Sequence, residues 1–121
     1  MSQRSDWQKP ANSGLELKVF KALEARGVGP LVRQHPLRLY NGVLIHPDVA
    51  VPEIRWAVEA DHVTWHGGPF DAQADKARDR QAQRIRWQVD RVTDLELNES
   101  FAATIDDLVD LFHLRASELA A

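Results

Sequence analysis

The feature that most constrains the fold is a pair of apolar stretches, 43–51 and 54–61, separated by Pro52 and Glu53. In 54–61, large apolar residues alternate with polar or small ones, as side chains do on the two faces of a β-strand. A break of two residues containing proline is typical of a tight turn. The sequence therefore predicts two neighbouring antiparallel strands, each with one apolar face and one polar face.

Helix and strand patterns occupy the remainder of the chain around this predicted hairpin. The expected elements are a helix over 13–27, strands over 32–40, 43–51 and 54–61, a helix over 71–87, a strand over 88–92 and a helix over 101–119. This order, αβββαβα, predicts an α/β (α+β) domain with a mixed central sheet flanked by helices. We expect residues 1–12 to form a flexible N-terminal tail and residues 13–121 to form the domain.

The length and composition narrow the class of protein. A chain of 121 residues fits one domain, and 44% hydrophobic and 27% charged residues are typical of a globular protein. Cysteine is absent, so any metal must be bound by oxygen or imidazole ligands. Residues 1–10 lack the apolar core of a signal peptide, and no apolar run approaches the roughly 20 residues that a membrane span needs, so we expect a cytoplasmic protein that does not bind membranes.

Three carboxylates fall close together on the predicted hairpin. Alternation places Glu59 and Asp61 on the face opposite the large apolar residues, and it places Asp48 on the same side of the preceding strand. With the turn centred near Glu53, Asp48 and Glu59 are cross-strand neighbours with Cβ atoms about 5 Å apart. Such a pair is destabilising unless a cation neutralises it, and carboxylates suit Mg²⁺ or Mn²⁺. The alternative is that these acids only line a solvated sheet face.

The acids also stand in a recognisable pattern. His46-Pro-Asp48, followed by ten residues and Glu59-Ala-Asp61, resembles the PD-(D/E)xK nuclease signature. Further segments are similar to the very-short-patch-repair-like endonuclease group, which includes actinobacterial domains of unknown function: 48–53, 57–61, Trp65-His66, Asp79-Arg80 and 87–93. The resemblance spans roughly residues 13 to 114. It implies a restriction-endonuclease-like fold and Mg²⁺-dependent hydrolysis of DNA phosphodiester bonds.

The resemblance also implies roles for single residues. Asp48 and Glu59 match the two acidic metal ligands, whereas Asp61 stands where the superfamily usually has a lysine that orients or activates water. The group resembled often has a downstream histidine instead, and His66 matches it. Glu16 matches an acid of the first helix that can complete the metal site. The pattern Ser13-x-x-Glu16 is equally that of a capping box, in which Glu16 bonds only the backbone.

A basic face is expected on the helix over 71–87. Lys76, Arg80 and Arg84 recur every four residues and could meet a DNA phosphate backbone. The alternative is a solvated face in which Asp75 and Asp79 pair with these cations. The formal net charge of -3 argues against a protein that coats nucleic acid without specificity.

The sequence thus leaves three functions open. The first is a divalent-metal-dependent DNA endonuclease or nickase that uses Asp48, Glu59 and Asp61, with His66 aiding proton transfer. The second is a catalytically impaired DNA-binding or regulatory module on the same fold. The third is a structural or partner-binding domain that uses the acidic final helix. No sequence-reading motif is visible, so a partner protein, a homodimer or DNA structure would select the target.

Overall fold

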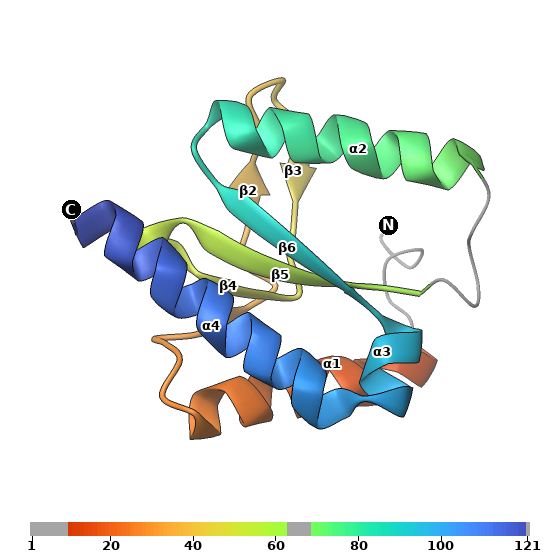
Figure 1. Ribbon diagram of the computed structural model, residues 1–121. Helices are drawn as coiled ribbons and strands as arrows, with labels where there is room; N and C mark the ends of the chain where they lie inside the picture. The colour runs from red at the N-terminus through yellow and green to blue at the C-terminus, as the bar shows by residue number, and fades with distance from the viewer. Residues whose placement is uncertain (1–9, 63–68, 121) are drawn as a thin grey trace.

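The chain forms one α/β domain in which a mixed four-stranded sheet lies between two layers (Figure 1). The computed structural model describes residues 10–62 and 69–120, with side chains from 14 to 62 and from 73 to 120. The sheet order is β1-β4-β5-β6, in which β5 and β6 are parallel and the other pairs antiparallel. The elements are α1 (Pro10–Ala25), β1 (Val32–Arg33), β2 (Leu37–Arg38), β3 (Leu44–Ile45), β4 (Val49–Val51), the 3-10 turn η1 (Pro52–Ile54), β5 (Trp56–Asp61), α2 (Pro69–Arg84), β6 (Gln88–Thr93), α3 (Asp94–Glu99) and α4 (Phe101–Ala120).

The predicted fold class and the mixed sheet flanked by helices are confirmed, but the first two predicted strands are each split. The stretch 32–40 forms β1 and β2, and 43–51 forms β3 and β4, with β2 and β3 paired in a separate hairpin. Gln34 has a φ of 52°, which turns the chain out of the strand after β1. Pro36 and Pro47 have no backbone N–H to donate to a ladder, so each marks a break.

Helix α1 begins earlier than the sequence pattern indicates. It starts at Pro10, so residues 10–12 belong to a helix and not to the expected tail, while residues 1–9 lie outside the described part. Ser13 is therefore inside the helix, not at its N-cap, and the capping-box interpretation of Glu16 is wrong. A capping box does occur at α3, where Thr93 and Glu96 bond each other's backbone N–H groups.

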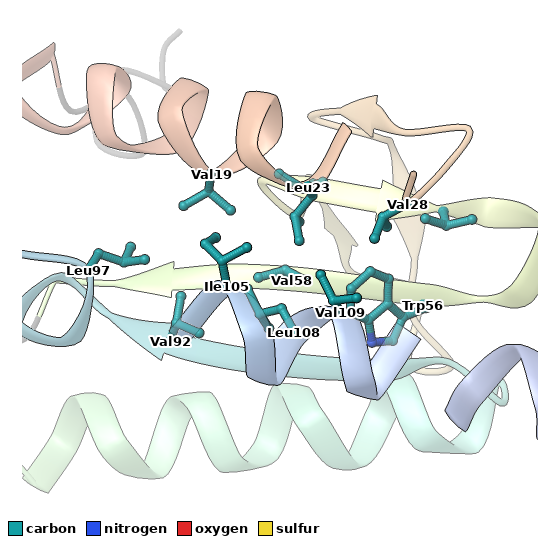
Figure 2. Packing of buried hydrophobic residues seen from close by; sticks show 12 residues of the cluster. Val19, Leu23, Val28, Trp56, Val58, Val92, Leu97, Ile105, Leu108 and Val109 are labelled. Atoms are coloured by element: carbon teal, nitrogen blue, oxygen red, sulfur yellow. The ribbon is translucent and has the colours of Figure 1, made fainter. Parts of the chain in front are cut away.

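Helices α1, α3 and α4 cover one face of the sheet and enclose the larger core (Figures 1 and 2). The buried residues of this core are Val19, Leu23, Val28, Val49, Val51, Trp56, Val58, Val92, Leu97, Ile105, Leu108 and Val109. Trp56 is fully buried, and its indole Nε1–H donates to Asp90 Oδ2 at 2.7 Å. That bond satisfies the one polar group of the largest core side chain.

The opposite face is covered by α2 and by the β2–β3 hairpin. The second core contains Leu37, Leu39, Ala50, Ala57, Ala82 and Trp87, with Ile45, Ile85 and Val89 packed against it. Small residues of β4 and β5 allow α2 and the hairpin to approach the sheet closely. The face that carries Glu59 and Asp61 is therefore half covered by protein and is not the open solvated face of the alternative interpretation.

Arg115 fixes the last helix to the point where β5 and β6 begin. Its guanidinium donates to the carbonyl oxygens of Ile54 at 2.8 Å, Arg86 at 2.6 Å and Arg55 at 3.4 Å. The carbonyls of Ile54 and Arg86 belong to turns, and that of Arg55 also accepts from the backbone N–H of Gln88 at 2.9 Å. Among the described helices, none is both long and apolar enough to cross a membrane.

Candidate active site

The β4–β5 register brings two of the predicted acids together. Val49 pairs with Val58, so the next residues outward, Asp48 and Glu59, lie opposite each other at the end of the antiparallel pair. The predicted hairpin register is therefore correct. This end of β4 and β5 lies on the α2 side of the sheet, because Asp48 and Glu59 share the phase of Ala50 and Ala57.

Asp48 is held by three neighbours from different parts of the chain. The backbone N–H of Ala60 donates to Asp48 Oδ2 at 2.8 Å, and Gln34 Nε2 lies 3.4 Å from Asp48 Oδ1. The carboxyl group of Glu16, from α1, lies within hydrogen-bonding contact of Asp48. Burial, and then the charge of Glu16, raise the pKa of Asp48 from 3.8 to about 7. Asp48 and Glu16 therefore form an acidic pair that favours a shared proton or a bound cation.

Glu59 faces an arginine from the helix above it. Arg78 Nη2 donates to Glu59 Oε2 at 2.7 Å, and the side chain of Glu59 is only 13% exposed. Burial raises the pKa of Glu59 from 4.5 to about 7; Arg78 opposes this rise and the charge of Asp48 adds to it. The two carboxylates thus interact electrostatically, as the predicted cross-strand pairing requires.

Asp61 pairs with Arg91, and Asp75 lies 3.9 Å from Arg91 and 3.8 Å from Arg78, the partner of Glu59. Arg91 Nη1 donates to Asp61 Oδ1 at 2.8 Å, while Nε and Nη2 of the same guanidinium donate to Asp79. Burial raises the pKa of Asp61, and Arg91 opposes that rise. Asp61 is therefore tied to β6 and α2 through Arg91, and the structure does not bring its carboxylate to Asp48.

The carboxylates that lie together determine what kind of metal site the protein could form. Among the side chains described, those of 14–62 and 73–120, no group of three or more histidines or carboxylates is placed to hold a metal ion. The acids that do interact are Glu16, Asp48 and Glu59. Mg²⁺ is commonly bound through only one or two carboxylates, with water and substrate phosphate completing its shell, so Asp48 and Glu59 fit a site of that kind. His66, the expected proton carrier, lies outside the described residues.

The predicted basic face of α2 makes no ion pair with the described acids of that helix. Lys76 and Arg80 are exposed, and neither makes an ion pair with a described residue. Asp75 and Asp79 contact Arg78 and Arg91 instead. The basic face is solvated, as the alternative interpretation expects, but Asp75 and Asp79 do not pair with its cations. Arg84 lies with its guanidinium 3.7 Å from the centre of the Tyr40 ring.

Sequence reasoning missed Arg78 and Arg91, the two cations that contact the acids. Both stand in a stretch with six basic residues, so composition does not distinguish them. The signal for Arg78 is its helical phase with Asp75, three positions earlier. The signal for Arg91 is its place in a strand parallel to β5, where it is the register partner of Glu59.

Comparisons with known proteins give relatives without a described activity. Two are uncharacterized proteins of Mycobacterium tuberculosis, one from strain CDC 1551 / Oshkosh and one from strain ATCC 25618 / H37Rv. Each is 28% identical over 79 residues, which cover 65% of this chain and 29% of the relative. The chain thus matches less than a third of the length of these proteins. No protein-family model and no solved structure matches it.

Proposed function

We propose that this chain is a divalent-metal-dependent DNA endonuclease or nickase that uses Mg²⁺ or Mn²⁺. The observation that carries the proposal is the pairing of Asp48 with Glu59 across β4 and β5, where burial raises the pKa of both carboxyl groups to about 7. Two buried acids facing each other are costly to ionise unless a cation joins them. The resemblance of the same residues to the PD-(D/E)xK signature supports DNA as the substrate.

The proposed roles follow from the contacts of each residue. Asp48 and Glu59 would hold the ion, and Glu16 would orient Asp48 from the α1 side. A bound divalent ion would polarise the phosphodiester and lower the pKa of a bound water. Arg78, beside Glu59, would supply the positive charge that Asp61 does not provide at the position of the motif lysine.

The proposal extends to residues around the site. Lys76, Arg80 and Arg84 would contact the phosphate backbone, since their charges are not neutralised by the acids of α2. His66 would assist proton transfer, and Asp61 would act indirectly by fixing Arg91. The reaction would take place in the cytoplasm, with a partner protein or a homodimer selecting the target.

The test is cleavage of supercoiled plasmid DNA by the purified protein with Mg²⁺ or Mn²⁺. We expect nicking by the wild type, a loss of at least about a hundredfold in Asp48→Ala and Glu59→Ala, and no loss in Glu53→Ala. Glu53 is a matched control because it is an exposed acid in the turn between the same two strands. Nicking that survives both active-site substitutions would overturn the proposal.

A second function is favoured by one observation. Glu59 and Asp61 each contact an arginine, so two of the three predicted acids are already neutralised by the protein itself. This arrangement suits a DNA-binding or regulatory module that does not hydrolyse its ligand. Binding with a steep salt dependence and without cleavage, in either metal, would identify that function.

A further inference from the structure

The β2–β3 hairpin stands apart from the main sheet and has two different sides. Leu37 and Leu39 are buried in the second core against α2 and Trp87. The other side presents two large side chains to solvent: Tyr40 is 57% exposed and Leu44, the register partner of Arg38, 44%. In Figure 1 the hairpin rises beside the sheet toward α2. The buried side anchors the hairpin, which leaves the exposed side free to contact a ligand.

Two arginines accompany these exposed residues. The guanidinium of Arg84 lies over the ring of Tyr40, 3.7 Å from its centroid, and Arg38 Nη1 donates to the carbonyl oxygen of Gly42 at 2.8 Å. Neither arginine forms an ion pair with a described residue. We name Arg38, Tyr40, Leu44 and Arg84 the hairpin surface. It combines an oriented aromatic ring, an apolar side chain and positive charge.

We propose that the hairpin surface binds single-stranded nucleic acid, with an unpaired base stacked on Tyr40. Arginine pairs with phosphate oxygens, and an exposed aromatic ring accepts a base of any sequence. Duplex DNA would satisfy the arginines but leave Tyr40 and Leu44 without apolar partners, because its bases are stacked inside. This inference rests on the proposed function and names its substrate class: DNA that has a single-stranded stretch.

The position of Arg84 on α2 relates the hairpin surface to the acids. Arg84 lies six positions after Arg78, which is about 9 Å along the helix axis. One helix therefore carries both the arginine that contacts Tyr40 and the arginine that contacts Glu59.

The chain offers a direct probe, because Tyr40 is its one tyrosine. Incorporation of 3-fluorotyrosine gives a single fluorine NMR signal that reports on this ring alone. We expect that signal to shift on addition of an oligothymidylate and to move far less with a duplex of the same length. Fluorescence anisotropy with a labelled oligothymidylate should show about tenfold or more weakening in Tyr40→Ala and near wild-type binding in Tyr40→Phe.

Matched variants separate base stacking on Tyr40 from a general apolar effect and from dimer formation. Leu114→Ala, which removes another exposed large side chain from α4, should leave oligothymidylate binding unchanged. The inference is overturned if Tyr40→Ala binds oligothymidylate with unchanged affinity, or if the fluorine signal does not shift when the oligonucleotide is added. So does a concentration-dependent dimer in sedimentation that is lost in Leu44→Ser, because the hairpin surface would then be an interface between copies.

The two proposals fail in different ways. Asp48→Ala should abolish nicking while leaving the oligothymidylate affinity and the fluorine shift intact, since Asp48 is not part of the hairpin surface. If the wild-type protein binds oligothymidylate with a base stacked on Tyr40 but nicks no DNA, this inference stands and the proposed hydrolysis is refuted. If Tyr40→Ala nicks duplex plasmid as well as the wild type does, and the wild type shows no fluorine shift, only this inference is refuted.

Discussion

Arg78 and Glu59 form an ion pair of 2.7 Å that joins helix α2 to strand β5. The carboxylate is 13% exposed and the guanidinium 35%, so the pair is shielded on the side of Glu59 and open on the side of Arg78. The sequence places an aspartate, Asp61, two positions after Glu59, where the resembled motif has lysine. The positive charge beside the candidate site therefore comes from a helix and not from the strand that carries the acid.

Removal of that charge should alter the pH dependence of metal binding. Arg78 lowers the pKa of Glu59, so in Arg78→Ala that pKa rises further above its ordinary value. We expect the midpoint of Mn²⁺ binding, followed by calorimetry across a pH series, to move to higher pH by about one unit. Arg80→Ala, which removes an exposed arginine of the same helix, serves as the control. An unchanged midpoint in Arg78→Ala would contradict the assigned contact.

The raised pKa values of Asp48 and Glu59 predict how the metal-free protein responds to pH. Each group holds its proton in the folded state up to about pH 7, whereas the unfolded chain releases it near its ordinary values of 3.8 and 4.5. The stabilising contribution is thus complete below about pH 4 and is lost as pH rises through about 7.

Urea denaturation with EDTA present checks this prediction. Between pH 4 and pH 8, the wild type should lose roughly 3 kcal/mol in its free energy of unfolding relative to Asp48→Asn, because asparagine does not titrate. Saturating Mn²⁺ should reduce that loss, because a cation offsets the charge of Asp48. A wild-type protein that gains stability relative to the variant over this range would show that Asp48 is not buried with its proton.

Arg91 should be a strong determinant of stability. It is 17% exposed and contacts both Asp61 and Asp79, so Arg91→Ala leaves two carboxylates without their cation. We expect the free energy of unfolding to fall by about 3 kcal/mol, whereas Arg80→Ala on the exposed face should change it by less than about 0.5 kcal/mol. Equal effects of the two substitutions in urea denaturation would refute the assigned network.

Much of the fold follows from local sequence patterns. The alternation in 54–61 and the short break before it were sufficient to predict the pairing of Asp48 with Glu59, because strand phase and turn position together determine register. The breaks within 32–40 and 43–51 were not predicted. They depend on the backbone at Gln34 and on the separate packing of the β2–β3 hairpin against α2, which is a tertiary contact.

The site was only partly predictable for a similar reason. Alternation predicts that Asp48, Glu59 and Asp61 share a face, but it does not say which of them a cation will contact. That depends on the crossover from β5 to β6, which aligns Arg91 with Glu59, and on the rotation of α2, which turns Arg78 inward. Both are long-range features, which the helical phase of Arg78 and the strand position of Arg91 do not determine.

Arg115 should stabilise the start of the sheet through its three backbone contacts. Arg115→Met keeps much of the aliphatic stem but leaves the carbonyl oxygens of Ile54 and Arg86 without a donor. We expect a loss of about 2 kcal/mol in the free energy of unfolding. Leu114→Ala, at the neighbouring and 60% exposed position, should lose less than about 0.5 kcal/mol. Thermal or urea unfolding of the two variants compares them directly.

The exposed cations of α2 should contribute to DNA affinity through charge alone. Lys76→Ala and Arg80→Ala should each weaken binding to any duplex and reduce the slope of log affinity against log salt by about 0.9. Anisotropy titrations at several salt concentrations measure that slope. Glu99→Gln, an exposed acid of α3, should leave the slope unchanged. A slope that does not respond to either basic substitution would place the DNA on another surface.

Helix α2 carries charged residues on two sides. Asp75, Arg78 and Asp79 face the candidate site on β5 and β6, whereas Lys76 and Arg80 face solvent. A change on one side therefore leaves the ion pairs of the other side intact. In protein engineering, the charged residues on the solvent side can therefore be substituted to change the affinity for polyanions. The ion pairs on the inner side keep their geometry. The same division lets random substitutions accumulate on the outer side without unfolding the domain.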